Sequence, residues 1–208
     1  MKRLLVYGGL LAGIVLVAFG VASIVLGISG RNEVTNDLKQ EKIIGSADMT
    51  PKAIAAEAQK AGLQNVSLPS CSVAGQAVDS GSRAKCFAQY MRVHTLLATG
   101  GALYAQMPQY ATADGKGTND ATQALTKNGK PQSNPNRAIW VTYTALTGAL
   151  NMSYFATQVG LFSIIMGIAL LLTGIGLIVL DLALLAQRAK PREAAAATAG
   201  GTARPAPA

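Results

Sequence analysis

Two cysteines are the residues of this chain best suited to form a covalent bond with each other. Cys71 and Cys86 are the only cysteines among the 208 residues. A redox-active pair is usually spaced C-x-x-C, and these two are much farther apart. We therefore expect a structural disulfide between them, which would contribute about 3 kcal/mol in the chain-entropy model for a closed loop of about 15 residues.

His94 is the only histidine of the chain, and the spacing of its apolar neighbours places it on the apolar face of a helix. With no partner group near it in sequence, a lone histidine is better explained as a packing residue than as a catalyst. A metal site needs several His, Cys or clustered carboxylate ligands. We therefore predict no metal, no cofactor and no enzymatic activity. The alternative is a ligand pocket formed by His94, Tyr90 and Tyr104.

Two long uncharged segments dominate the composition, which is 50% hydrophobic and only 13% charged. A helix needs about 20 apolar residues to cross a hydrocarbon core of roughly 30 Å. We therefore predict transmembrane helices at 4–29 and 155–181. A cleaved signal peptide is the alternative for the first segment, but its apolar run exceeds the roughly 7–15 residues of such a signal. Asp181 follows the second run, and we expect it at the cytoplasmic interface of the membrane.

The charges beside the two spans predict their orientation. Lys2 and Arg3 precede the first span, and a basic tail follows the second. Basic residues next to a span are retained in the cytoplasm. We therefore expect residues 1–3 and the tail 182–208 in the cytoplasm, and residues 30–154 outside. The net charge of +8 is then divided between a weakly basic outer domain and two ends that face an anionic leaflet, which argues against a nucleic-acid partner.

The outer segment, residues 30–154, is expected to be helical. Thr50 followed by Pro51 is typical of a helix start, with a capping residue and then proline at the first helical position. A second helix is expected at about 83–99, because its apolar residues recur at helical spacing. We expect Ser82 to cap this second helix.

These helices, with extensions of the two spans, predict an all-α fold. We expect a small four-helix bundle outside the membrane, standing on two antiparallel transmembrane helices. The polar stretch 111–134 is expected to be a mobile exposed loop. The cytoplasmic tail 182–208 is rich in Ala, Pro and Gly and is expected to be disordered.

Glycines recur every seven residues in both predicted spans. They are Gly13, Gly20 and Gly27 in the first span and Gly160, Gly167 and Gly174 in the second. A seven-residue repeat keeps one stripe facing a partner helix, and small residues there let the two backbones approach closely within lipid. We therefore expect these glycines to pack the two spans together. The alternatives are a stripe that serves a homodimer or a larger partner, and the general abundance of glycine in membrane helices.

Most of residues 4–185 resembles a family of small two-span membrane proteins from high-GC Gram-positive bacteria. The resemblance is carried by RVHTLLATGGALYAQM at 92–107, by VTNDLKQEKI after the first span, and by WVTYTALTGALNMSYFATQVG leading into the second. The family has no established activity, and this chain has an unusually long polar insertion at 111–134. Some members carry an automatic label of aromatic ring-opening dioxygenase subunit. Such iron enzymes of the two-His-one-carboxylate type need two histidines, and this chain has one.

These observations predict an integral protein of the bacterial plasma membrane with a multi-pass topology. We expect a non-enzymatic interaction or scaffold protein, such as an accessory subunit of a cell-envelope complex. Its partners would be the lipid bilayer and either a larger membrane complex or a second copy of the chain. The alternative function is an exoplasmic domain that binds or senses a small ligand near His94.

Overall fold

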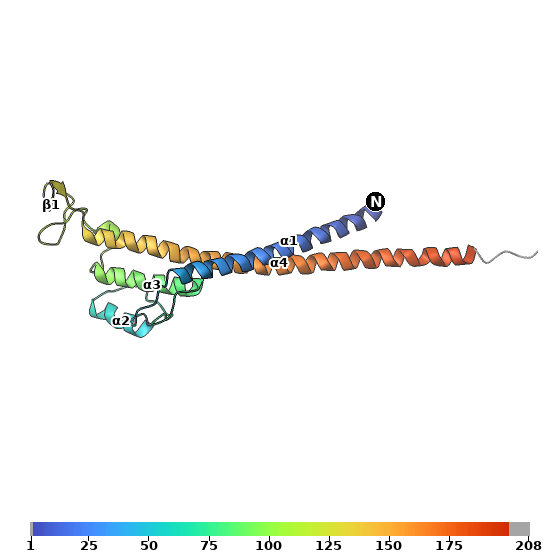
Figure 1. Cartoon of the computed structure of the whole chain (residues 1–208), viewed down its shortest axis with the longest axis horizontal. Helices are drawn as coiled ribbons and strands as arrows, with labels where there is room; N and C mark the ends of the chain where they lie inside the picture. The colour runs from blue at the N-terminus through green and yellow to red at the C-terminus, as the bar shows by residue number, and fades with distance from the viewer. Residues whose placement is uncertain (1, 200–208) are drawn as a thin grey trace, which may run out of the picture. The chain divides into compact units, whose positions relative to one another are not determined.

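The computed structural model describes residues 2–199, with side chains from residue 7 to residue 187. Within this range the chain is mostly helical, as predicted, and Figure 1 shows its helices. The helices are α1 (Lys2–Gln40), α2 (Pro51–Lys60), α3 (Gly81–Ala98) and α4 (Pro135–Ala199), with a short 3₁₀ turn, η1, at Tyr104–Gln106.

The chain forms two compact units. The first, which we call the apolar unit, consists of residues 2–29 together with 159–199 in the described part of the chain. The second, which we call the outer unit, is Gly30–Gln158. Helices α1 and α4 each contribute residues to both units.

Both long helices contain segments that are long and apolar enough to cross a membrane. The candidate spans lie within Tyr7–Gln40 and Pro135–Gln187. Only 17% and 11% of their most apolar windows are buried, whereas the core helix of a soluble protein would be mostly buried. Large apolar side chains such as Leu11, Phe19 and Leu172 point outward, where lipid would solvate them.

The two short helices begin at the signals that the sequence carries. The Thr50 hydroxyl accepts a hydrogen bond from the Ala53 N–H at 3.2 Å, and proline follows Thr50 at the first helical position. Helix α3 begins earlier than predicted, because Ser80 rather than Ser82 is its cap. Ser80 has an extended backbone, and its hydroxyl accepts from the Arg83 N–H at 3.5 Å.

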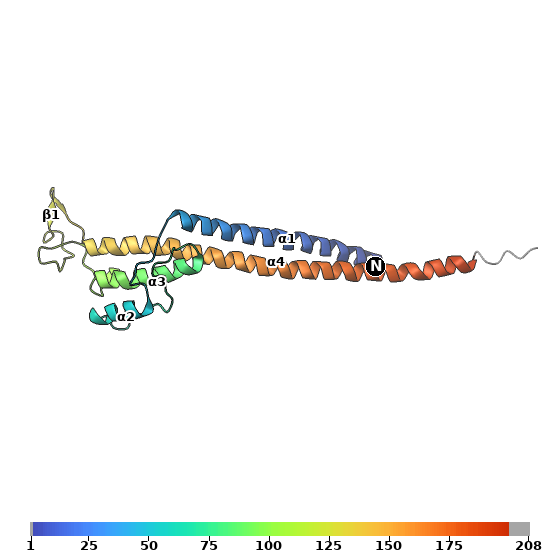
Figure 2. The ribbon, with the colours of Figure 1, turned by 60° about the horizontal axis from the view of Figure 1, so that its bottom comes forward.

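The core of the outer unit is formed by residues from all four helices. Its buried members include Leu38 of α1, Ile54 of α2, Val93 of α3 and Leu150 of α4. Figures 1 and 2 both show α2 beside α3. At the start of α3, a Cβ on Gly81 would lie 2.5 Å from the Thr157 hydroxyl of α4, so a side chain there would not fit.

The stretch 111–134 contains a small two-stranded sheet within a chain that is otherwise mostly helical, as predicted. Strands β1 (Thr126–Lys127) and β2 (Lys130–Pro131) pair antiparallel across Asn128 and Gly129. Both of these turn residues have positive φ, at 52° and 73°. Asn-Gly is the strongest short-range signal for such a hairpin, because its turn requires positive φ at both central positions. The polar stretch therefore contains one short segment of regular backbone pairing.

Helix α4 extends beyond the end of the predicted span. The backbone is helical through 182–199, where the sequence analysis expects disorder, and residues 200–208 lie outside the described part of the chain. The physical reason is composition, since alanine has the highest intrinsic helix propensity and this segment is rich in it.

Candidate functional site

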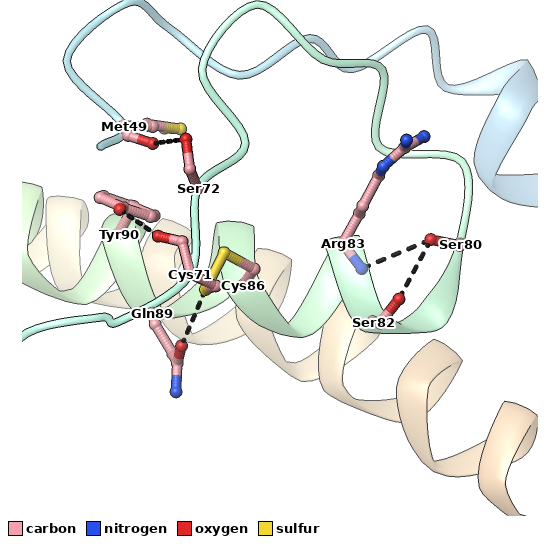
Figure 3. The surroundings of a disulfide bond; sticks show 9 residues. All are labelled: Met49, Cys71, Ser72, Ser80, Ser82, Arg83, Cys86, Gln89 and Tyr90. Carbon is pink, nitrogen blue, oxygen red and sulfur yellow. Dashed lines mark hydrogen bonds between the residues drawn. A yellow bond between two sulfur atoms is a disulfide. The ribbon is translucent and has the colours of Figure 1, made fainter. Parts of the chain in front are cut away.

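The predicted disulfide is present in the outer unit. Cys71 and Cys86 are bonded, with their Cα atoms 6.1 Å apart, and Figure 3 shows the bond joining a loop to α3. One turn further along α3, the Tyr90 hydroxyl donates to the Cys71 carbonyl oxygen at 2.5 Å. On the other side, the Ser72 hydroxyl donates to the Met49 carbonyl oxygen at 3.3 Å. The loop is therefore fixed to α3 by one covalent bond and one hydrogen bond, and Ser72 ties it to the segment that precedes α2.

Tyr90 has a structural place in this arrangement. Its side chain is fully buried in the core of the outer unit. Burial raises the pKa of the Tyr90 phenol, and the nearby negative charge of Asp48 raises it further. Tyr90 is thus a neutral donor that satisfies a loop carbonyl, and it does not offer its hydroxyl to a pocket.

His94 lies in a polar cluster with two carboxylates from other elements. Its Nε2 atom is 2.7 Å from Oδ2 of Asp48, which lies in the loop before α2. Glu57 of α2 is the third member, and ligand atoms from the three side chains all lie within 4.8 Å of one another. We call Asp48, Glu57 and His94 the carboxylate–histidine cluster.

The cluster is polar, charged and open to solvent. The side chains of His94 and Asp48 are 26% and 30% exposed. A hydrogen bond from Ser46 is the main influence that lowers the pKa of Asp48, and His94 lowers it further through its charge and its hydrogen bond. Partial burial opposes these effects. At neutral pH, Asp48 therefore presents a carboxylate to His94.

The sequence shows no such cluster, and we therefore predicted no metal site. Asp48 and His94 are 46 positions apart, and only the packing of α2 and its preceding loop against α3 brings the three side chains together. Asp48 lies two residues before the Thr50 that begins α2. A single sequence contains no local spacing that connects these residues to His94.

Tyr104, which we predicted to share a pocket with His94, lies in a different place. It lines an apolar groove of about 550 Å³ with Trp140, Val141, Thr144 and Ala145, and neither His94 nor Tyr90 lines this groove. The Arg137 guanidinium lies 4.1 Å from the centre of the Tyr104 ring. Trp140 is buried, and its ring N–H donates to the Ala102 carbonyl oxygen at 3.0 Å. Tyr104 therefore lines a groove to which neither of the other two residues contributes.

The periodic glycines meet in pairs within the apolar unit. Cβ atoms placed on Gly13, Gly20 and Gly27 would lie 2.9, 2.7 and 2.6 Å from the carbonyl oxygens of Gly174, Gly167 and Gly160, respectively. As residue numbers rise along α1, those of the partners fall along α4. All six glycines are buried, whereas a Cβ on Gly8, Gly30 or Gly176 would have nothing within 4 Å. Backbone thus contacts backbone at positions where any side chain would keep the helices apart.

Asp181 continues the seven-residue series after Gly174, but it is a carboxylate. Its side chain is only 8% exposed, and it contacts Gly9 of α1. Among the described residues, its Oδ2 atom has no hydrogen-bond partner. We expected Asp181 at the cytoplasmic interface of the membrane, and in the structure α1 covers its side chain.

A glycine substitution tests the close contact between the helices. Gly20→Ala should destabilise the helix pair by about 1–3 kcal/mol, because the added methyl group overlaps the Gly167 carbonyl and forces the backbones apart. The measurement is unfolding of the detergent-solubilised chain by SDS, followed by circular dichroism. Gly176→Ala is the matched control and should be neutral or stabilising by up to about 1 kcal/mol, since its methyl group meets open space. Equal effects of the two variants would contradict the packing role.

The disulfide is expected to stabilise the outer unit without contributing chemistry. Replacing both Cys71 and Cys86 with serine should lower the free energy of unfolding by about 3 kcal/mol, because the unfolded chain regains the entropy of an open loop. The measurement is denaturant unfolding of the purified full chain. Treating the wild-type chain with a reductant should reproduce the loss. A double variant as stable as the oxidised chain would contradict a structural role for the bond.

Similarity to known proteins adds no functional assignment. No protein-family model, curated protein or solved structure matches this chain. The functional conclusion therefore depends on three features of the molecule itself, namely the glycine contacts, the disulfide-tied outer unit and the carboxylate–histidine cluster.

Proposed function

We propose that this chain is an integral protein of the bacterial plasma membrane that acts as a non-enzymatic accessory or scaffold subunit of a cell-envelope complex. The observation that carries the proposal is the pair of long apolar helices whose apolar side chains face outward. In water this surface would drive aggregation, whereas in a bilayer it is solvated by lipid.

The glycine contacts support an antiparallel hairpin in the membrane. Gly27 meets Gly160 and Gly13 meets Gly174, so the two spans would cross the bilayer in opposite directions. Both ends of the chain would then lie on one side, and the basic residues next to the spans favour the cytoplasm for that side. The outer unit would lie outside, where its disulfide would persist.

The outer unit is proposed to be a small four-helix bundle that contacts other membrane proteins. A core with members from all four helices supports the bundle. The groove around Tyr104, Trp140 and Val141 supports the contact role, because Tyr104 and Val141 expose large apolar surfaces there. Val141 precedes the predicted span at 155 by about 20 Å of helix. The partner proposed for this groove is another membrane protein with an exoplasmic part.

A second candidate function is the binding of a small ligand by the outer unit. The observation that favours it is the carboxylate–histidine cluster, which gathers two carboxylates and an imidazole from α2, α3 and the loop before α2. This function is compatible with the first, since a bound ligand could regulate contacts with a partner.

Labelling of introduced cysteines tests the membrane arrangement. A membrane-impermeant maleimide should label Ala113→Cys in intact protoplasts, because residue 113 is exposed in the outer unit. The matched variant Gln187→Cys is also exposed and should be labelled only after lysis, since it would face the cytoplasm. The reverse pattern, or labelling of both sites in intact protoplasts, would contradict the proposed sidedness.

Crosslinking in cells tests the interaction role. A photoreactive amino acid at Val141 should give one discrete adduct, which mass spectrometry would identify as another membrane protein. The same group at Lys127, which is exposed on the hairpin and does not line the groove, is the control and should give no such adduct. A second copy of the chain in the adduct would reassign the groove to self-association. Equal or absent crosslinking at both positions would contradict the interaction role.

A further inference from the structure

We propose that Asp48, Glu57 and His94 form a binding site for a divalent transition-metal cation, with Zn²⁺ as the representative to be tested first. The inference goes beyond the scaffold function and does not depend on the orientation of the chain in a membrane. It rests on the composition, geometry and accessibility of the carboxylate–histidine cluster.

The donor set suits a borderline divalent cation. One imidazole nitrogen and two carboxylate oxygens are all common zinc ligands. Two carboxylates bring two negative charges, which a divalent cation neutralises. Imidazole favours zinc, copper, nickel and iron, whereas calcium and magnesium prefer sites made only of oxygen atoms.

The distances allow coordination after small side-chain movements. Zinc bonds of about 2.0–2.1 Å to nitrogen and oxygen place neighbouring tetrahedral ligands about 3.3 Å apart. The three donor atoms already lie within 4.8 Å of one another. The His94–Asp48 contact of 2.7 Å must open by about half an ångström as the cation replaces the hydrogen bond. Side-chain rotation alone can provide this change.

Backbone hydrogen bonds hold the loop that carries Asp48 in place before any cation binds. The Thr50 N–H donates to the Asp48 carbonyl oxygen at 2.7 Å, and the Met49 N–H donates to the Ser46 carbonyl oxygen at 3.0 Å. The Val73 N–H donates to the Met49 carbonyl oxygen at 3.2 Å, next to the loop that the disulfide ties to α3. A ligand set held by its surroundings loses less entropy when it binds an ion.

The site is open enough for a cation to enter and to keep further ligands. Three protein donors leave at least one coordination position of zinc for water or for a side chain of a partner. His94 and Asp48 are partly exposed, so a hydrated ion can reach them without opening the core.

Glu57 distinguishes a metal site from a purely structural hydrogen bond between Asp48 and His94. The hydrogen bond between Asp48 and His94 could by itself link the loop before α2 to α3, but such a tie does not involve Glu57. The metal site needs Glu57 as its third ligand. Replacing Glu57 therefore affects metal binding and leaves the tie intact.

The experiment uses the full chain in detergent, purified through a tag without histidine and stripped of metal by a chelator. Zinc affinity and stoichiometry are measured by competition with a chromogenic chelator. We expect one zinc ion per chain, together with a rise in melting temperature. Loss of a supporting residue outside the ligand shell typically costs about 10–100-fold in metal affinity. Glu57→Gln and His94→Gln, which remove ligands, should each weaken binding by about tenfold or more.

The controls keep the test independent of folding and of the membrane arrangement. Glu33→Gln replaces an exposed carboxylate elsewhere in the outer unit and should bind zinc as the wild type does. Metal-free Glu57→Gln should melt at the wild-type temperature, which shows that it is folded. Absence of saturable zinc binding, or equal affinity in Glu57→Gln and the wild type, would overturn the proposal. Tighter binding of Ca²⁺ or Mg²⁺ than of Zn²⁺ would overturn the assigned class of metal.

Discussion

The close approach of two apolar helices is the constraint on which the rest of this structure depends. In the proposed membrane setting, lipid would remove the hydrophobic driving force between such helices, so their association would rely on many short van der Waals contacts. Glycines at Gly13, Gly20 and Gly27 give these contacts by bringing backbone atoms of α1 and α4 together. The same two helices supply Leu38 and Leu150 to the core of the outer unit. Helices α1 and α4 therefore contribute the glycine contacts of the apolar unit and part of the core of the outer unit.

The outer unit combines a small core with long irregular connections. A core of this size gives limited stabilisation, and the loop that contains Cys71 adds chain entropy that folding must offset. The disulfide reduces that entropy in the unfolded chain, and Tyr90 satisfies the carbonyl next to it. The same fixed loop lies beside Met49, the neighbour of Asp48. The covalent bond and the polar cluster are thus connected through a few hydrogen bonds of one loop.

Features encoded by neighbouring or periodic residues could be predicted from the sequence, and features created by packing could not. Thr50 and Pro51 located α2, and the two cysteines could pair only with each other. The hairpin at Asn128 and Gly129 was encoded locally, but its signal was overlooked within a polar stretch. The cluster around His94 depends on contacts between residues far apart in the chain. Sequence alone gives no distances for such contacts.

The buried carboxylate of Asp181 bears on how the protein is made. In the proposed membrane hairpin, an unpartnered acidic group near the end of an apolar helix raises the free energy of inserting that helix alone into lipid. Gly9, which covers this group, belongs to the helix that leaves the ribosome first. Insertion of α4 is therefore favoured once α1 already occupies the bilayer. Because α1 is synthesised first, it would already be in place to pack against the Asp181 carboxylate when α4 inserts.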